Sequence, residues 1–151
     1  MINVENWLKK DVRDPIYDTD QYKAKEKAES EGFQVVYTHE LANPNLNRLL
    51  LDIDNQVTFD ELPQRLSCVN KAFPIKDVLW KRSKSGNYHV MVFMDSKVYF
   101  DKKEKFLIEV CLGSDWKRGI YNLKNFHDNS ISGMLFTVKE TCWNTLAFGD
   151  K

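Results

Sequence analysis

Apolar and polar positions follow different spacings along the chain, and these spacings predict its first elements. A charge-dense stretch that begins near Asp18 or Asp20 favours a solvated helix ending at Gly32. Residues 33–39 are rich in β-branched and aromatic side chains, which is typical of a strand. The continuous apolar run over residues 46–54 is short for a helix, so it predicts a central strand buried on both faces.

The spacing then becomes helical. Thr58 and Glu61 form a capping-box pattern with Thr58 at the N-cap, and Pro63 follows early enough to be tolerated near the first turn. The apolar positions of this helix fall on one stripe, and they are Phe59, Leu62, Leu66, Val69 and Phe73. We therefore expect an amphipathic helix that packs against the sheet.

The second half of the chain predicts a hairpin and further elements. Residues 77–84 and 88–94 read as strands, and the Ser-, Gly- and Asn-rich segment between them predicts a tight turn. Residues 101–112 have helical spacing, and 114–126 predict a third short helix. A last strand is expected over residues 132–140.

The order of these elements predicts the fold class. From residue 46 onward it is β-α-β-β-α-β, the plan of RNA-recognition-like and ferredoxin-like domains. We therefore expect an α+β palm with a mostly antiparallel sheet, helices on one face and the other face open. A chain of 151 residues suits one such domain, here residues 33–151, preceded by a helical extension over residues 1–32.

Composition excludes several function classes. Lys plus Arg and Asp plus Glu each number 22, and the resulting zero net charge excludes a histone-like basic coat but not a local basic patch. Cys68, Cys111 and Cys142 are widely spaced and form no C-x-x-C pair, which favours reduced thiols acting as small apolar residues in a cytoplasmic protein. No apolar run is long enough for a membrane helix, so we expect no membrane partner.

Asp52 and Asp54 are the first candidate site. Residues two apart in a strand point to the same face, so the two carboxylates are expected to lie side by side. Their mutual repulsion favours a cation between them, and Mg²⁺ takes such oxygen ligands. The simpler interpretation is that Asp54 begins a turn and Asp52 lies at a strand edge.

The predicted hairpin turn is the second candidate site. Ser83, Lys84 and Ser85 combine hydroxyls, a cation and a Gly-containing turn, which suits phosphate binding. His89 follows just inside the next strand, from where it would reach the same phosphate. The simpler interpretation is an ordinary hairpin with a core histidine.

The third candidate site follows the helix predicted over residues 101–112. Asp115 adds a carboxylate, and Lys117 and Arg118 add two cations. The simpler interpretation is a solvated loop between helices.

Together, the D-x-D strand, the S-x-S-G-x-x-H hairpin and the S-D-x-K-R loop resemble the archaeo-eukaryotic primase superfamily, and in particular its small phage and plasmid members. The resemblance spans residues 46–136 and implies that Asp52, Asp54 and Asp115 bind two Mg²⁺ or Mn²⁺ ions. These three residues and His89 would form the catalytic set. The phosphate-binding residues implied by the resemblance are Ser83, Lys84, Ser85, His89, Lys117 and Arg118.

The resemblance also implies an activity. It implies a DNA-directed primase–polymerase, a nucleotidyltransferase that synthesises or extends oligonucleotides from (d)NTPs in replication or repair. Two metal ions would activate a 3′-hydroxyl and stabilise the leaving pyrophosphate. The implied partners are nucleoside triphosphates, a single-stranded DNA template and a helicase or other replication protein, in the cytoplasm of a bacterial or phage-infected cell. Tyr88 and Trp116 are candidates for stacking on template bases, and the simpler interpretation of each is an aromatic side chain packed within the fold.

Two other functions fit parts of the pattern. An open-faced sheet also suits a non-catalytic module that binds nucleic acid or protein, such as a replication accessory or an inhibitor of a host system. The segment Leu49-Leu50-Leu51-Asp52-Ile53-Asp54-Asn55 also resembles the opening of haloacid-dehalogenase-type phosphatases, in which the first Asp is the nucleophile and the second a general acid. That family needs a parallel sheet and a late acidic pair, whereas this sequence predicts a hairpin and has no such pair.

Overall fold

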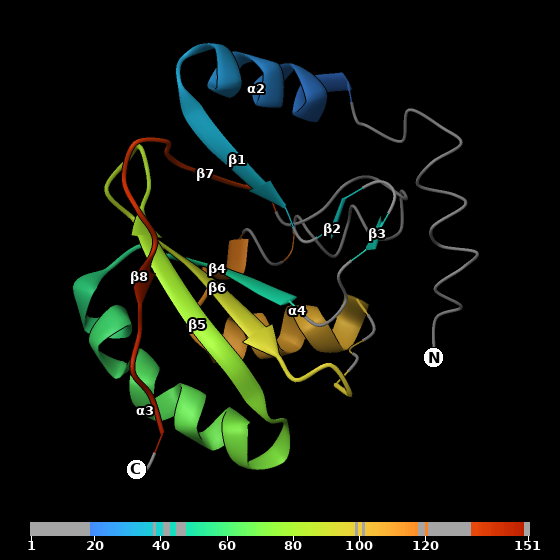
Figure 1. Cartoon of the computed structure of the whole chain (residues 1–151), viewed down its shortest axis with the longest axis vertical. Coiled ribbons are helices and arrows are strands. Elements are labelled where there is room, and N and C mark those ends of the chain that lie inside the picture. The colour runs from blue at the N-terminus through green and yellow to red at the C-terminus, as the bar shows by residue number, and fades with distance from the viewer. Residues whose placement is uncertain are drawn as a thin grey trace.

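The computed structural model shows an α+β protein, which confirms the predicted class (Figure 1). It describes residues 19–37, 39–40, 43–44, 48–98, 100, 102–117, 120 and 134–149. The helices are α2 (Thr19–Ser30), α3 (Gln56–Ala72) and α4 (Lys102–Cys111). The strands are β1 (Phe33–Tyr37), β2 (His39–Glu40), β3 (Asn43–Pro44), β4 (Arg48–Ile53), β5 (Ile75–Arg82), β6 (Tyr88–Met94), β7 (Met134–Val138) and β8 (Asn144–Thr145).

The main sheet has the strand order β4-β6-β5-β8, and its neighbouring strands are antiparallel. The predicted hairpin is confirmed as β5 and β6, which pair from Ile75↔Met94 to Arg82↔Tyr88. The predicted last strand is present as β7, but it pairs with β1 in a separate two-stranded sheet. The short strand β8 pairs with β5 and forms the other edge of the main sheet.

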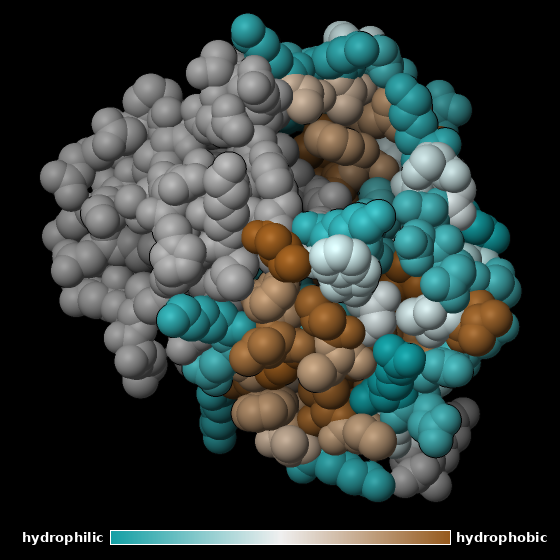
Figure 2. Space-filling view, turned by 180° about the vertical axis from the view of Figure 1, so that it is seen from behind, coloured by the Kyte–Doolittle hydropathy of each residue, from teal (hydrophilic) through white to brown (hydrophobic). Residues whose placement is uncertain are grey.

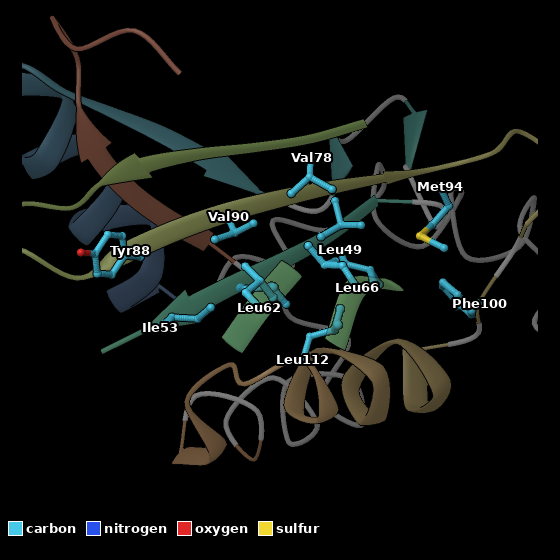
Figure 3. Close-up of a cluster of buried hydrophobic side chains, with 12 residues drawn as sticks. Leu49, Ile53, Leu62, Leu66, Val78, Tyr88, Val90, Met94, Phe100 and Leu112 are labelled. Carbon is cyan, nitrogen blue, oxygen red and sulfur yellow. The ribbon is translucent and has the colours of Figure 1, made fainter. Parts of the chain in front are cut away.

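One face of the main sheet packs against α3 and α4. In β4, Leu49, Leu51 and Ile53 are fully buried and alternate with side chains that point to the other face. Leu62 from α3 and Leu112 from the end of α4 meet them in the same core (Figure 3). Burying one such side chain fully contributes about 1.5–3 kcal/mol, so this layer is the main stabilising element of the fold.

The opposite face of the main sheet was expected to be open, but the structure shows that it is partly covered. Leu50 and Met91 point to this face and pack with Leu135 of β7 in a second apolar cluster. Val36 of β1 lies against the same cluster. The two-stranded β1–β7 sheet therefore lies on the side of the main sheet away from α3, together with α2 (Figure 1).

The start of α3 differs from the predicted capping box. Asn55 is the N-cap, with extended backbone, and its side-chain oxygen accepts a 2.8 Å hydrogen bond from the Thr58 backbone N–H. Thr58 thus lies in the first turn, and Glu61 pairs instead with Arg65 at 2.8 Å. Pro63 consequently lies inside the helix rather than near its first turn. Asn55 caps the helix because it directly precedes Gln56, the first residue of α3, and has a short side chain suited to this role.

The apolar stripe on α3 is confirmed for four of its five positions. Leu62 and Leu66 are buried, and Phe59 and Val69 pack against the same core. Phe73 is the residue that ends the helix, and it is 38% exposed. The predicted N-terminal helix and the helix over 101–112 are also present, as α2 and α4. The short helix predicted over 114–126 lies mostly outside the described residues.

Gly113 ends α4 in a conformation that suits glycine. Its φ is +101°, which side chains on L-residues rarely tolerate. A Cβ atom at this position would lie 2.4 Å from Cγ2 of Thr58. The glycine therefore allows the end of α4 to approach the first turn of α3.

The cysteines and the helices bear on two expectations from composition. Cys68, Cys111 and Cys142 are free, and all three are exposed rather than packed as small apolar residues in the core. Of the helices that the structure describes, none combines the length and the apolar character that a membrane span requires.

Candidate functional site

Asp52 and His89 face each other across β4 and β6 on the side of the main sheet away from α3. The two residues are direct partners in the strand register. His89 Nε2 lies 3.3 Å from Asp52 Oδ1, and the side chains are only 6% and 15% exposed. Two of the predicted catalytic residues therefore meet, in a partly desolvated position where their electrostatic interaction is stronger than at the surface.

The loop after α4 holds the free edge of β4 at this point. The Asp52 backbone N–H donates to Ser114 Oγ at 3.0 Å, and its carbonyl accepts from the Asp115 N–H at 2.8 Å. Farther along the same edge, the Leu50 N–H donates to Glu109 Oε2 at 2.7 Å. The fold thus brings the third predicted motif, around Asp115, beside the first, around Asp52, although the two are distant along the chain.

The carboxylates of the three predicted metal ligands do not form a tight cluster. Asp115 is half-buried, and its Oδ1 accepts from the Lys117 N–H at 3.1 Å. Asp54 lies just beyond β4, is exposed and accepts from the Asn55 side chain at 3.2 Å. Within the described part of the chain, no group of three His, Cys, Asp or Glu side chains is arranged to hold a metal ion.

The hairpin turn is connected to the Asp52 side chain. Ser83 is buried, and its hydroxyl accepts from the Asn87 N–H at 2.9 Å and lies 3.2 Å from the hydroxyl of exposed Ser85. The Asn87 side-chain amide reaches Asp52 Oδ1 at 3.5 Å. The second motif therefore adjoins the first, while its Ser85 hydroxyl stays accessible to solvent.

The predicted cationic residues differ in their placement. Lys84 forms an ion pair of 3.1 Å with Glu31, in which the two side chains are 63% and 40% exposed. Such an exposed pair is worth little and does not prevent Lys84 from binding an anion. Lys117 is exposed, and its ammonium lies 5.8 Å from the centre of the Trp116 ring. Arg118 lies outside the described residues.

The two candidate stacking residues also differ. Tyr88 is 5% exposed and stacks on Phe59, with ring centroids 3.8 Å apart, while its hydroxyl donates to Gln56. The Tyr88 ring is therefore part of the core, and its expected role in stacking on template bases is wrong. Trp116 is 59% exposed, next to Asp115, so its ring is available for stacking.

Sequence reasoning missed Lys81. Lys81 pairs with His89 in the register, so Asp52, His89 and Lys81 form one row across β4, β6 and β5. Lys81 is 2% exposed, and its ammonium donates to Gln34 Oε1 at 3.1 Å. Burial lowers the pKa of Lys81, and the Cys142 charge opposes this shift. The alternation of β5 contained the signal, because Lys81 stands two residues after Leu79 and shares its face.

Comparisons with known proteins add no assignment. No protein-family model matches the chain, and neither a curated protein nor a solved structure matches it.

Proposed function

We propose that this chain is a primase–polymerase-like nucleotidyltransferase core that synthesises or extends oligonucleotides from (d)NTPs on single-stranded DNA. The observation that carries the proposal is the contact between Asp52 and His89, with Oδ1 and Nε2 3.3 Å apart, beside the Asp115 loop. A carboxylate next to a histidine and a polar turn suits the binding of a metal-bound triphosphate.

The metal proposal needs few protein ligands. Mg²⁺ is commonly held by one or two carboxylates together with substrate phosphates and waters. Asp52 and Asp115 would supply the carboxylates, since their segments are hydrogen-bonded to each other. Asp54 is exposed just beyond the end of β4 and would join when a nucleotide brings the ions. The bound Mg²⁺ or Mn²⁺ would activate the attacking 3′-hydroxyl and neutralise charge on the leaving pyrophosphate.

The chain's own residues would position the triphosphate. His89 would donate to a phosphate oxygen through Nδ1, which has no hydrogen-bond partner among the described residues, while Asp52 accepts from Nε2 and holds the ring in place. Ser85, Lys84 and Lys117 are exposed. The Ser85 hydroxyl would donate a hydrogen bond to a phosphate oxygen, and the two ammonium groups would neutralise phosphate charge. Ser83, whose hydroxyl is bonded within the turn, would act by fixing the turn geometry.

The arrangement of the central strands supports an RNA-recognition-like palm. In the β-α-β-β part of the chain, the first strand, β4, and the second, β5, both flank the third, β6. The adjacent helices α3 and α4 contribute to the same core, on one face of the sheet. In such a palm, the end of β4 would carry Asp52 of the first motif, and the start of β6 would carry His89 of the second.

Activity on DNA would also involve partners. Trp116 and Lys117 are exposed beside the Asp115 loop and would contact the single-stranded template through stacking and phosphate neutralisation. A helicase or another replication protein, in the cytoplasm of a bacterial or phage-infected cell, would place the chain on its template.

Primer synthesis and extension on single-stranded DNA test this proposal. The purified chain is assayed with NTPs or dNTPs and with Mg²⁺ or Mn²⁺, alongside Asp52→Asn and the exposed control Asp60→Asn on α3. We expect oligonucleotide products from the wild type and from Asp60→Asn, and none from Asp52→Asn. Folded wild-type protein that yields no product with either metal would contradict the catalytic proposal.

One observation favours the non-catalytic binding module as a second candidate. Apolar side chains gather on one face of the molecule, seen from behind in Figure 2. Among the large apolar residues of the described part of the chain, four are more than half exposed, namely Val57, Leu107, Trp116 and Ile120. A protein or nucleic acid that covers them would explain this exposure. The phosphatase alternative has less support, because its parallel sheet contrasts with the antiparallel pairing of the main sheet.

A further inference from the structure

Gln34 on β1 accepts hydrogen bonds from three donors at one atom. Its Oε1 lies 3.1 Å from Lys81 Nζ, 3.3 Å from Thr137 Oγ1 and 3.2 Å from Trp143 Nε1. An ammonium and an indole N–H can only donate, so the atom at this point must be the oxygen. A neutral amide oxygen has two lone pairs, which three donors must share.

The buried ammonium of Lys81 has no carboxylate partner among the described residues. Its side chain is 2% exposed, and its contacts are the Gln34 hydrogen bond and the Trp143 ring, whose centre is 5.4 Å from Nζ. The described residues supply no carboxylate within ion-pair distance of its ammonium. A buried ammonium with no carboxylate partner is costly. The Cys142 charge opposes this effect only in part, so on balance burial lowers the pKa of Lys81.

We propose that Lys81, Thr137 and Trp143 form a binding site for an oxyanion, and that the Gln34 amide oxygen occupies this site in the absence of the ligand. The three donors come from β5, from β7 and from the segment after β7, and they converge on one point. An anionic oxygen at that point supplies the missing counter-charge and accepts all three bonds more strongly than an amide oxygen does. This inference does not depend on the proposed nucleotidyltransferase activity.

The site can be reached from solvent by movement of one side chain. Gln34 is an exposed residue and Trp143 is half-buried, whereas Lys81 and Thr137, which both donate to Gln34 Oε1, are buried. Rotation of the Gln34 side chain therefore uncovers the donors without separating β1 from β7. Because Gln34 competes with the ligand from within the chain, it lowers the apparent affinity for an external anion.

The ligand chemistry is that of a small oxyanion, carried either by a phosphate or by a carboxylate. Both present an anionic oxygen, but a phosphate also presents further oxygens toward solvent. The Trp143 indole N–H reports on occupancy directly, because it donates to Gln34 Oε1. Its ¹H–¹⁵N signal can be assigned by comparison with Trp143→Phe.

The test is an NMR titration of the full ¹⁵N-labelled chain with inorganic phosphate and, separately, with acetate at constant ionic strength. We expect Gln34→Ala to show a saturable shift of the Trp143 indole signal, at a concentration at least about tenfold lower than the wild type requires. Tighter binding of phosphate identifies a phosphate group as the ligand, and tighter binding of acetate identifies a carboxylate. The absence of a saturable shift in Gln34→Ala with both anions overturns the proposal.

Lysine variants provide the control. Lys81→Met in the Gln34→Ala background is expected to abolish saturation, whereas Lys76→Met, an exposed lysine on the same strand, leaves it intact. Saturation that survives Lys81→Met also overturns the proposal. Gln34→Glu gives a second readout without loss of the lysine, because its carboxylate would fill the site. This variant should melt at a higher temperature than Gln34→Ala and show no phosphate-dependent shift, and a lower melting temperature contradicts the inference.

Discussion

His89 lies directly opposite Asp52 on the neighbouring strand, with its Nε2 3.3 Å from the carboxylate oxygen. This contact orients the imidazole so that Nε2–H donates to Asp52, while Nδ1 is buried and makes no hydrogen bond with the described residues. The pair therefore fixes the position of a histidine inside a sheet face that is otherwise partly apolar. Its strength is open to direct measurement.

A double-mutant cycle on this pair should show a clear coupling. The double variant Asp52→Asn/His89→Gln is expected to lose less free energy of unfolding than the sum of the losses in the two single variants. The difference, which is the coupling energy, should be about 1–3 kcal/mol because the pair is largely desolvated. Urea unfolding measures it. The exposed Glu61 and Arg65 pair on α3 is the matched control and should couple by only about 0.3–0.5 kcal/mol. Equal coupling in the two pairs would show that burial adds nothing to the Asp52–His89 contact.

The N-cap of α3 can be tested by two substitutions. Asn55→Ala should lower the free energy of unfolding by about 1 kcal/mol, because it removes the acceptor for the Thr58 N–H. Thr58→Val keeps the side-chain shape and removes the hydroxyl, so it should change stability by much less. Chemical denaturation of both variants decides between the two caps, and a larger loss in Thr58→Val would restore the capping-box prediction.

Gly113→Ala should destabilise the protein for two separable reasons. A positive φ costs an L-residue about 1–2 kcal/mol, and the added Cβ would lie 2.4 Å from Thr58 Cγ2. Thr58→Ser removes that methyl group and should recover part of the loss. Thermal melts of the two single variants and the double variant test this, and full additivity of their effects would mean that the close contact is not responsible.

Lys81 should make stability depend on alkaline pH. Its folded-state pKa is lowered from the ordinary value of 10.5, so in the window between the two values the unfolded chain binds more protons than the folded one. The destabilisation from burying its charge is therefore present below the folded pKa and is relieved as pH rises toward 10.5. Relative to Lys81→Met, the wild type should gain stability with pH across this window. The exposed Lys76→Met provides the control, and a flat difference for Lys81→Met would contradict a lowered pKa.

Elements whose signal is local were predictable from the sequence. The strand β4 was predictable because Leu49 to Leu51 form an apolar run, and the hairpin because the segment after Arg82 is rich in turn residues. The stripe on α3 follows from spacing alone. The contact between Asp52 and the Asp115 loop was expected from the resemblance, whereas nothing in the spacing required it.

The rest depends on contacts between distant segments. The pairing of β7 with β1 cannot be read from periodicity, because an apolar strand suits either sheet, and this pairing covers the face that was expected to be open. The cap at Asn55 was missed because Thr58 and Glu61 form an equally good local pattern. Tyr88 was misassigned because its burial arises from Phe59 on another element.

Metal-dependent binding of a nucleoside triphosphate tests the central claim most directly. Isothermal titration of the wild-type chain with dATP in the presence of Mn²⁺ should show saturable binding that disappears when the metal is chelated. Asp52→Asn and His89→Gln should each weaken this binding at least about tenfold, and the exposed control Asp60→Asn should not. Folded wild-type protein that binds no triphosphate with metal, or that binds it equally well after Asp52→Asn, would contradict the account.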